Sequence, residues 1–114
     1  LADKTGIRRY GFCLLPMDEA LVQSAIDISG RAHLECNLSF KSQKIGFFDV
    51  ELVTEFFKAL CLNSGITLHI NMISGSNSHH IAEATFKSVA QSLRQAIEKD
   101  IKIGQEIPST KGVL

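Results

Sequence analysis

The sequence predicts a two-layer α+β domain in which a four-stranded sheet carries two helices on one face. Four short segments alternate apolar and polar residues, as strands with one buried face do. Two longer segments repeat apolar residues at helical spacing, and turn residues separate the six segments in the order β-β-β-α-β-α. Each amphipathic helix can cover only one face of the sheet. At 114 residues without a linker, residues 1–114 form a single domain with one core.

The first three strands follow one another directly. Residues 7–17 suit the first strand, and the turn residues at 16–19 end it. Residues 20–29 form the second, followed by a Ser-Gly-Arg turn. In the third strand, residues 31–40, side chains point alternately to two faces. One face carries Ala32, Leu34, Cys36, Leu38 and Phe40, and the other carries Arg31, His33, Glu35, Asn37 and Ser39.

The first helix is expected to begin after Asp49 as N-cap and to end at Gly65. Its apolar stripe consists of Leu52, Phe56, Ala59 and Leu60. The fourth strand, residues 66–73, follows and turns His69 toward the polar face.

The second helix is expected to be capped within Ser76–Ser78 and to end near Asp100. Its core stripe consists of Ala82, Phe86, Val89, Leu93 and Ile97. Residues 101–114 form an irregular tail.

The sheet face that the helices leave uncovered is predicted to be polar, and two interpretations of it stay open. It carries Arg9, Asp27, Arg31, His33 and His69. Water can solvate such a face, as in many antiparallel sheets. A partner can also cover it, because apolar residues lie between the polar ones. We interpret His33 as a surface histidine.

Charge and cysteine usage exclude several classes of protein. Twelve basic side chains balance twelve acidic ones, so no broad surface for nucleic acid or anionic membrane is expected. No run of about 18 apolar residues and no secretory signal is present. The three cysteines are odd in number and lie in apolar segments, which indicates free thiols in a reducing compartment. We therefore expect a cytoplasmic protein.

The stretch "SNSHHIAEATFK" places two histidines at the start of the second helix. Because each helical residue advances by about 100°, His79 and His80 diverge and Glu83 lies between them. This geometry suits two metal ions better than one, with the carboxylate able to join either. Imidazole and carboxylate ligands suit manganese, iron or zinc. The spacing differs from the metalloprotease pattern of two histidines four residues apart.

A polar helix start without metal explains the same residues. Solvated histidines with Glu83 complementing the helix N-terminus need no ion. His69 lies ten residues before His79 on the strand that leads into the helix, so it completes a compact ligand set. With His69 included, the metal site and the polar helix start stand as equal alternatives.

Five segments resemble, in order, the C-terminal half of imidazoleglycerol-phosphate dehydratase, over essentially the whole chain. They are "RRYGFCLLPMDEAL", "DISGRAHL", "FFDVELVTEFFKAL", "LHINMISGSNSHHIAEATFKSVAQSLRQA" and "IPSTKG". The resemblance implies an enzyme of histidine biosynthesis, a carbon–oxygen lyase that dehydrates imidazole glycerol phosphate to imidazole acetol phosphate. Family members consist of two similar halves with this element order. They use two Mn²⁺ ions per site and form sites between subunits of a homo-oligomer built from trimers. From the charge balance, we expect neither nucleic acid nor membrane as a partner of this chain.

Matched by motif, the resemblance assigns two sets of site residues. The metal ligands would be His69, His79, His80 and Glu83. The phosphate and neighbouring substrate groups would be held by Arg9, Arg31, Ser109, Thr110 and Lys111. Metal on the substrate's imidazole can stabilise the charge that develops during dehydration, and paired N–H groups of arginine suit phosphate.

Glu83 is the candidate catalytic residue, in the first place as a metal ligand. The catalytic base stays open, because Glu19 lies in another family motif and the other half of the family's fold can supply a base. We expect Lys87, one helical turn after Glu83, to orient the Glu83 carboxylate.

The chain departs from the family in one large respect. Family members carry a second motif, D-H-H-x-x-E-D, in an N-terminal half, and residues 1–6 resemble the end of that half. We therefore expect a truncated C-terminal half that is inactive alone and binds Mn²⁺ weakly. The alternative is a non-catalytic assembly module that keeps only the fold and the oligomer surface. A small RNA-binding domain shares the element order, but balanced charge and the lack of exposed aromatic motifs disfavour it.

Overall fold

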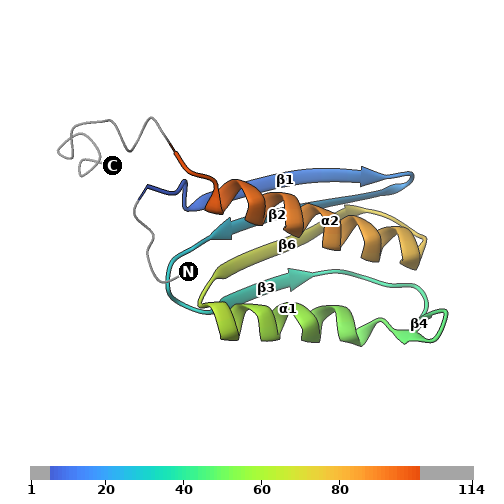
Figure 1. The fold of residues 1–114 in the computed structure, drawn as a ribbon. Helices are drawn as coiled ribbons and strands as arrows, with labels where there is room; N and C mark the ends of the chain where they lie inside the picture. The colour runs from blue at the N-terminus through green and yellow to red at the C-terminus, as the bar shows by residue number, and fades with distance from the viewer. Residues whose placement is uncertain (1–5, 101–114) are drawn as a thin grey trace.

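A four-stranded sheet forms one layer of the computed structural model, which describes residues 6–100 (Figure 1). The strands are β1 (Tyr10–Met17), β2 (Ala20–Asp27), β3 (His33–Asn37) and β6 (Thr67–Ser74). They lie in the order β1-β2-β6-β3, with β3 parallel to β6 and the other pairs antiparallel. The second layer consists of α1 (Glu51–Ser64) and α2 (Ser78–Ile97), both on one face of the sheet. The predicted fold class is confirmed.

A small ribbon lies outside the main sheet. It pairs β4 (Lys44–Ile45) with β5 (Phe48–Asp49), in the segment between β3 and α1. Asp49 belongs to this ribbon, so its prediction as N-cap of α1 is wrong. The N-cap is Val50, which makes no side-chain capping hydrogen bond, whereas the predicted C-cap Gly65 adopts the left-handed conformation at φ 67°.

The buried side of α1 differs from the predicted stripe by one residue. Val53, Phe57 and Cys61 are buried against the sheet. Leu52 and Phe56, which were expected in the core, are 49% and 52% exposed. The apolar residues of α1 form two adjacent stripes, and only packing decides which of them meets the sheet.

The α2 helix is packed unusually close to the sheet through small residues. Ser24 and Ser92 are fully buried, and their hydroxyl oxygens lie 2.6 Å apart. A Cβ added at Gly11 of β1 would lie 1.7 Å from the Ser92 carbonyl oxygen, so this approach requires glycine. Ile97, which was predicted in the core stripe, is 43% exposed, since the helix ends there rather than near Asp100.

The pleat of the strands separates the two faces of the sheet as predicted. Leu68 and Ile70 of β6 are fully buried under the helices, whereas His69 is exposed on the outer face. The β1 strand adds exposed apolar side chains to that outer face, namely Tyr10, Phe12 and Leu14. No helix within residues 6–100 is long and apolar enough to span a membrane.

Candidate functional site

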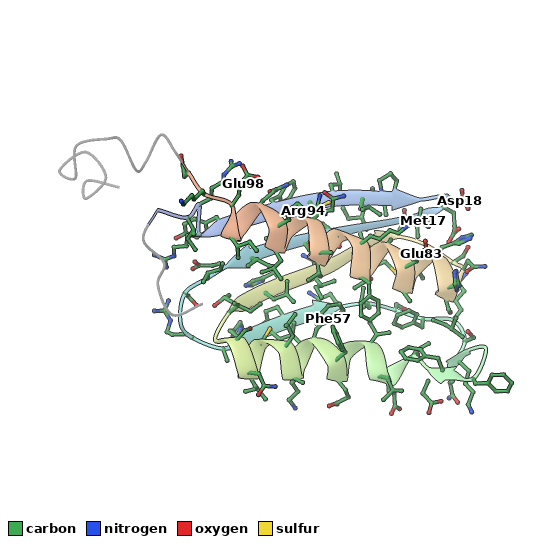
Figure 2. All side chains as sticks on the ribbon, in the orientation of Figure 1. Met17, Asp18, Phe57, Glu83, Arg94 and Glu98 are labelled. Carbon is green, nitrogen blue, oxygen red and sulfur yellow. The ribbon has the colours of Figure 1, made fainter. Side chains whose placement is uncertain are left out.

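The β1–β2 turn and the start of α2 lie together at one end of the molecule. Figure 2 shows Asp18, Met17 and Glu83 near this end, and Arg94 and Glu98 toward the other. Asn77 is the N-cap of α2, and its side-chain oxygen accepts the His80 backbone N–H at 3.0 Å. The first turn of α2 therefore presents His80 to the side chains of the β1–β2 turn.

His80 lies between two carboxylates of this turn. Its Nδ1 is 2.6 Å from Glu19 Oε1, and its Nε2 is 3.4 Å from Asp18 Oδ2. The hydrogen bond to Glu19 raises the pKa of His80, and the nearby negative charges act in the same direction.

Glu19 is held by backbone groups as well. Its Oε2 accepts the N–H groups of Ser76 at 2.9 Å and Asn77 at 2.8 Å. These two hydrogen bonds, followed by the one from His80, lower the pKa of Glu19 to about 2. Glu19 is therefore ionised at neutral pH. Sequence reasoning missed its contact with His80, although both residues lie in motifs that carry the family resemblance.

His79 belongs to a separate arrangement of charges. Its Nε2 is 3.2 Å from Glu83 Oε1, and Lys87 Nζ is 2.8 Å from Glu83 Oε2. Lys87 is the main cause of the lowered pKa of Glu83. The expectation that Lys87 contacts and orients this carboxylate is therefore met. The rings of His79 and His80 have centroids 6.3 Å apart and planes inclined by 73°, so the two imidazoles diverge as predicted.

His69 does not join the two helix histidines. It points away from the helix layer, and its ring centroid lies 6.0 Å from that of His33, which is exposed as predicted. The expectation of a compact set of His69, His79 and His80 is wrong for this chain. The reason is the strand pleat, which directs His69 to the face opposite α2.

The two arginines lie at the other end of the sheet. Arg9 immediately precedes β1 and Arg31 shortly precedes β3, and the first residues of these strands share one row of the sheet. Asp18 and Glu19 follow the opposite end of β1, whose eight residues span about 26 Å at about 3.3 Å each. Within the described residues, Arg9 and Arg31 are therefore not adjacent to His79, His80 and Glu83.

Arg9 is already paired in this arrangement. Its Nε donates to Asp27 Oδ1 at 2.7 Å and its Nη2 to Asp27 Oδ2 at 3.3 Å. A guanidinium has five N–H donors, so three remain for a further anion. Ser109, Thr110 and Lys111 lie outside the described residues.

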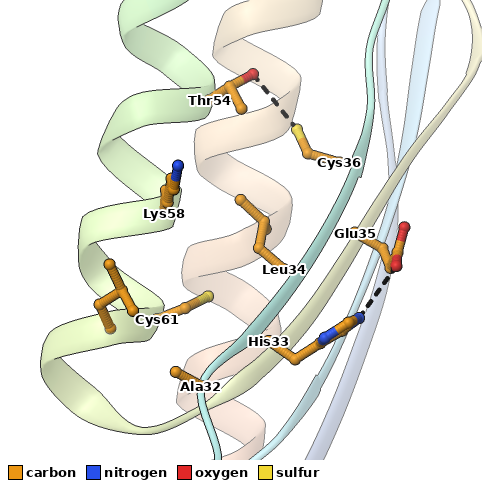
Figure 3. Close-up of a pocket in the computed structure, with 9 residues that line it drawn as sticks. Ala32, His33, Leu34, Glu35, Cys36, Thr54, Lys58 and Cys61 are labelled. Atoms are coloured by element: carbon orange, nitrogen blue, oxygen red, sulfur yellow. Dashed lines mark hydrogen bonds and ion pairs between the residues drawn. The ribbon is translucent and has the colours of Figure 1, made fainter.

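A pocket of about 520 Å³ lies between β3 and α1 (Figure 3). Leu34, Cys36, Thr54, Lys58 and Cys61 line much of it, and none of the predicted site residues within 6–100 does. All three cysteines are free, as predicted, and burial raises the pKa of each thiol.

The side chains at the start of α2 are of types that bind a metal ion, but too few of them lie together to hold one. Imidazole and carboxylate groups are ligands that manganese accepts, and a carboxylate on the second ring nitrogen is usual for ligating histidines. Within residues 6–100, however, no three His, Cys, Asp or Glu side chains are placed to hold one ion. The described chain therefore offers two partial donor sets, and a complete shell needs further ligands.

Comparison with known proteins places this chain in a family. The family model for imidazoleglycerol-phosphate dehydratase matches residues 1–93. Proteins of that name from Roseobacter denitrificans and Cereibacter sphaeroides are 61% and 60% identical over all 114 residues, and the chain spans 58% of their length.

Solved structures agree with the sequence match. The crystal structure of the Staphylococcus aureus dehydratase superposes with a TM-score of 0.83 and 45% identity, covering 86% of this chain and 57% of that one. The Pyrococcus furiosus structure has a TM-score of 0.79 and 38% identity, with 96% and 60% of the two chains covered. The chain belongs to the imidazoleglycerol-phosphate dehydratase family.

Proposed function

We propose that this chain contributes to a metal-dependent dehydratase of histidine biosynthesis that converts imidazole glycerol phosphate to imidazole acetol phosphate. The observation that carries the proposal is the pair of diverging imidazoles, each with its own carboxylate, at the start of α2. His79 with Glu83 and His80 alone would each contribute to one of two Mn²⁺ ions. His69 would serve in a site that another copy or segment completes. We place this biosynthetic enzyme in the cytoplasm.

The chain's own residues would bind and orient the substrate. When bound, Mn²⁺ supplies stabilisation of the negative charge that develops on the imidazole ring as the C–H proton leaves. Arg9, held by Asp27, keeps three N–H donors for phosphate, and exposed Arg31 lies at the same end of the sheet. Ser109, Thr110 and Lys111 would add hydroxyl groups and a positive charge. Binding the remote phosphate would position the reacting carbons.

A complete site would draw on more than one chain. The arginines and the helix histidines lie at opposite ends of a sheet whose first strand spans about 26 Å, so one chain cannot present both sets to one small substrate. The exposed apolar residues Tyr10, Phe12 and Leu14 support coverage of the outer sheet face by a partner. We therefore propose a homo-oligomer built from trimers, with sites between subunits.

The test adds to this chain the N-terminal part that the longer relatives have. We expect the purified 114-residue chain to bind Mn²⁺ weakly in electron paramagnetic resonance titrations and to show no dehydration. Fusing it behind the remaining N-terminal part of the Roseobacter denitrificans protein, which is 61% identical over this region, should produce dehydration of imidazole glycerol phosphate.

Replacing His79 and His80 together by alanine in the fusion should abolish turnover, while His33→Ala, which removes an exposed histidine outside the candidate site, should leave it intact. A fusion that assembles but does not dehydrate the substrate would contradict the proposed reaction. Dehydration by the 114-residue chain alone, at the rate of the fusion, would contradict the expectation that this chain is inactive without the part that the longer relatives carry.

A further inference from the structure

The surroundings of Glu19 are inconsistent with the role of a catalytic base. Its Oε2 accepts the backbone N–H groups of Ser76 and Asn77, and its Oε1 faces His80 Nδ1 at 2.6 Å. Both oxygens are thus engaged. A general base must be free to reach the proton that it abstracts, whereas both oxygens of Glu19 already accept hydrogen bonds within this chain.

The same hydrogen bonds determine where the proton of the neutral His80 ring lies. The Glu19 carboxylate already accepts two backbone N–H groups, so it acts as the acceptor toward His80 as well, and Nδ1 carries the hydrogen in this contact. In the neutral ring this leaves the lone pair on Nε2. Asp18 is the carboxylate near Nε2, at 3.4 Å, and its side chain is 76% exposed. The Nε2 side of the ring therefore faces an exposed carboxylate of the β1–β2 turn.

Backbone hydrogen bonds also hold the first turn of α2 against Glu19. The His80 N–H donates to the side chain of Asn77, while the Asn77 N–H donates to Glu19. Glu19 therefore links the β1–β2 turn to both the cap and the first turn of α2. The His80 ring is fixed by one residue from the strand turn and by the backbone of the helix to which it belongs.

We propose that Glu19 is a positioning residue that holds His80 in the Nδ1–H tautomer and thereby presents Nε2 as the metal-binding nitrogen. This inference rests on the proposed function only in treating His80 as a ligand. Carboxylates that hold the far nitrogen of a ligating histidine in this manner orient the ring and strengthen it as a ligand.

Glu19→Gln is a sharp test because an amide has only one oxygen. Two backbone N–H groups point at the Oε2 position, so the amide oxygen of glutamine should take that place and its NH₂ group should face His80. An NH₂ group donates to Nδ1 and therefore favours the Nε2–H tautomer. The substitution should reverse the tautomer while keeping the size of the side chain.

The measurement is ¹⁵N nuclear magnetic resonance of the metal-free 114-residue chain labelled at histidine, at a pH above the pKa of His80. We expect His80 as Nδ1–H in the wild type and as Nε2–H in Glu19→Gln. Asp18→Asn is the matched control, because it neutralises the other carboxylate beside the same ring and should leave the Nδ1–H form. If Glu19 only stabilised the fold, Glu19→Gln would not change the tautomer of His80.

Metal affinity provides the second readout. Mn²⁺ titration followed by electron paramagnetic resonance should show Glu19→Gln binding about 10- to 100-fold more weakly than the wild type. A wild-type ring in the Nε2–H form, an unchanged tautomer in Glu19→Gln, or equal Mn²⁺ affinity of the two proteins would overturn the inference. The tautomer is read without metal or substrate, so a failed dehydration assay with the expected tautomers would overturn the proposed reaction alone.

Discussion

At the residue scale, two neighbouring histidines have different surroundings because consecutive helical residues point about 100° apart. His80 turns toward the β1–β2 turn and meets Glu19, whereas His79 stays on the surface of α2 and meets Glu83. The divergence and the Glu83–Lys87 contact follow from spacing along one helix, so the sequence predicts them. The Glu19–His80 contact joins residues 61 positions apart, so helical spacing cannot predict it.

Lys87→Met is expected to raise the pKa of Glu83 toward its ordinary value of 4.5, because Lys87 is the main cause of the lowered value. Since the folded-state pKa is lowered, this ion pair stabilises the fold above the unfolded-state pKa. That stabilisation is lost as the pH falls through the folded-state pKa. The measurement is a ¹³C titration of the Glu83 carboxyl. Lys58→Met, which removes a lysine on α1, is the control, and equal Glu83 pKa values in both variants would refute the assignment.

At the scale of the elements, helical spacing predicted where α1 and α2 lie and the buried side of α2, where Ala82 and Val89 are buried, but not the buried side of α1. Leu52 with Phe56, and Val53 with Phe57, are equally apolar stripes one residue apart. The contact of Phe57 with Phe86 of α2, at a centroid distance of 4.9 Å, belongs to the buried stripe. In α2, small residues are buried because Gly11 lets β1 approach the helix backbone. The helical spacing of apolar residues does not predict this contact.

Replacing each of two adjacent phenylalanines by alanine tests the corrected stripe. Phe57 is 1% exposed, so Phe57→Ala should lower the free energy of unfolding by about 3–5 kcal/mol. Phe56 is 52% exposed and mainly contributes ring contacts, so Phe56→Ala should cost about 1 kcal/mol. Urea denaturation of both variants measures the two free energies of unfolding. A larger loss for Phe56→Ala than for Phe57→Ala would support the stripe predicted from the sequence.

At the scale of the whole molecule, the length of the sheet separates Arg9 and Arg31 from His79 and His80. The arginines lie where β1 and β3 begin, and the helix histidines lie where β1 ends. Because His69 points outward while α2 covers the other face, the three predicted histidine ligands also divide between two surfaces. This separation is the reason for our proposal that sites form between copies.

A mixing experiment in the fusion protein tests this division. A variant lacking His79 and His80 and a variant with Arg31→Ala should each be inactive as a pure assembly. Assemblies formed from both should regain part of the dehydration activity, because some sites then combine the intact arginine of one chain with the intact histidines of another. Activity no higher than that of the separate variants would show that both sets serve one site from one chain.

The sequence by itself determined the element order, the helix end at Gly65, the faces of the strands and the divergence of His79 from His80. These features depend on residues a few positions apart, which share a strand or a helix turn. Only the tertiary structure decided that Glu19 holds His80 and that His69 lies on the sheet face opposite α2. It also decided that Arg9 and Arg31 lie at the end of the sheet opposite His79 and His80. Those relations depend on how strand turns and helix ends meet in space, which local spacing does not encode.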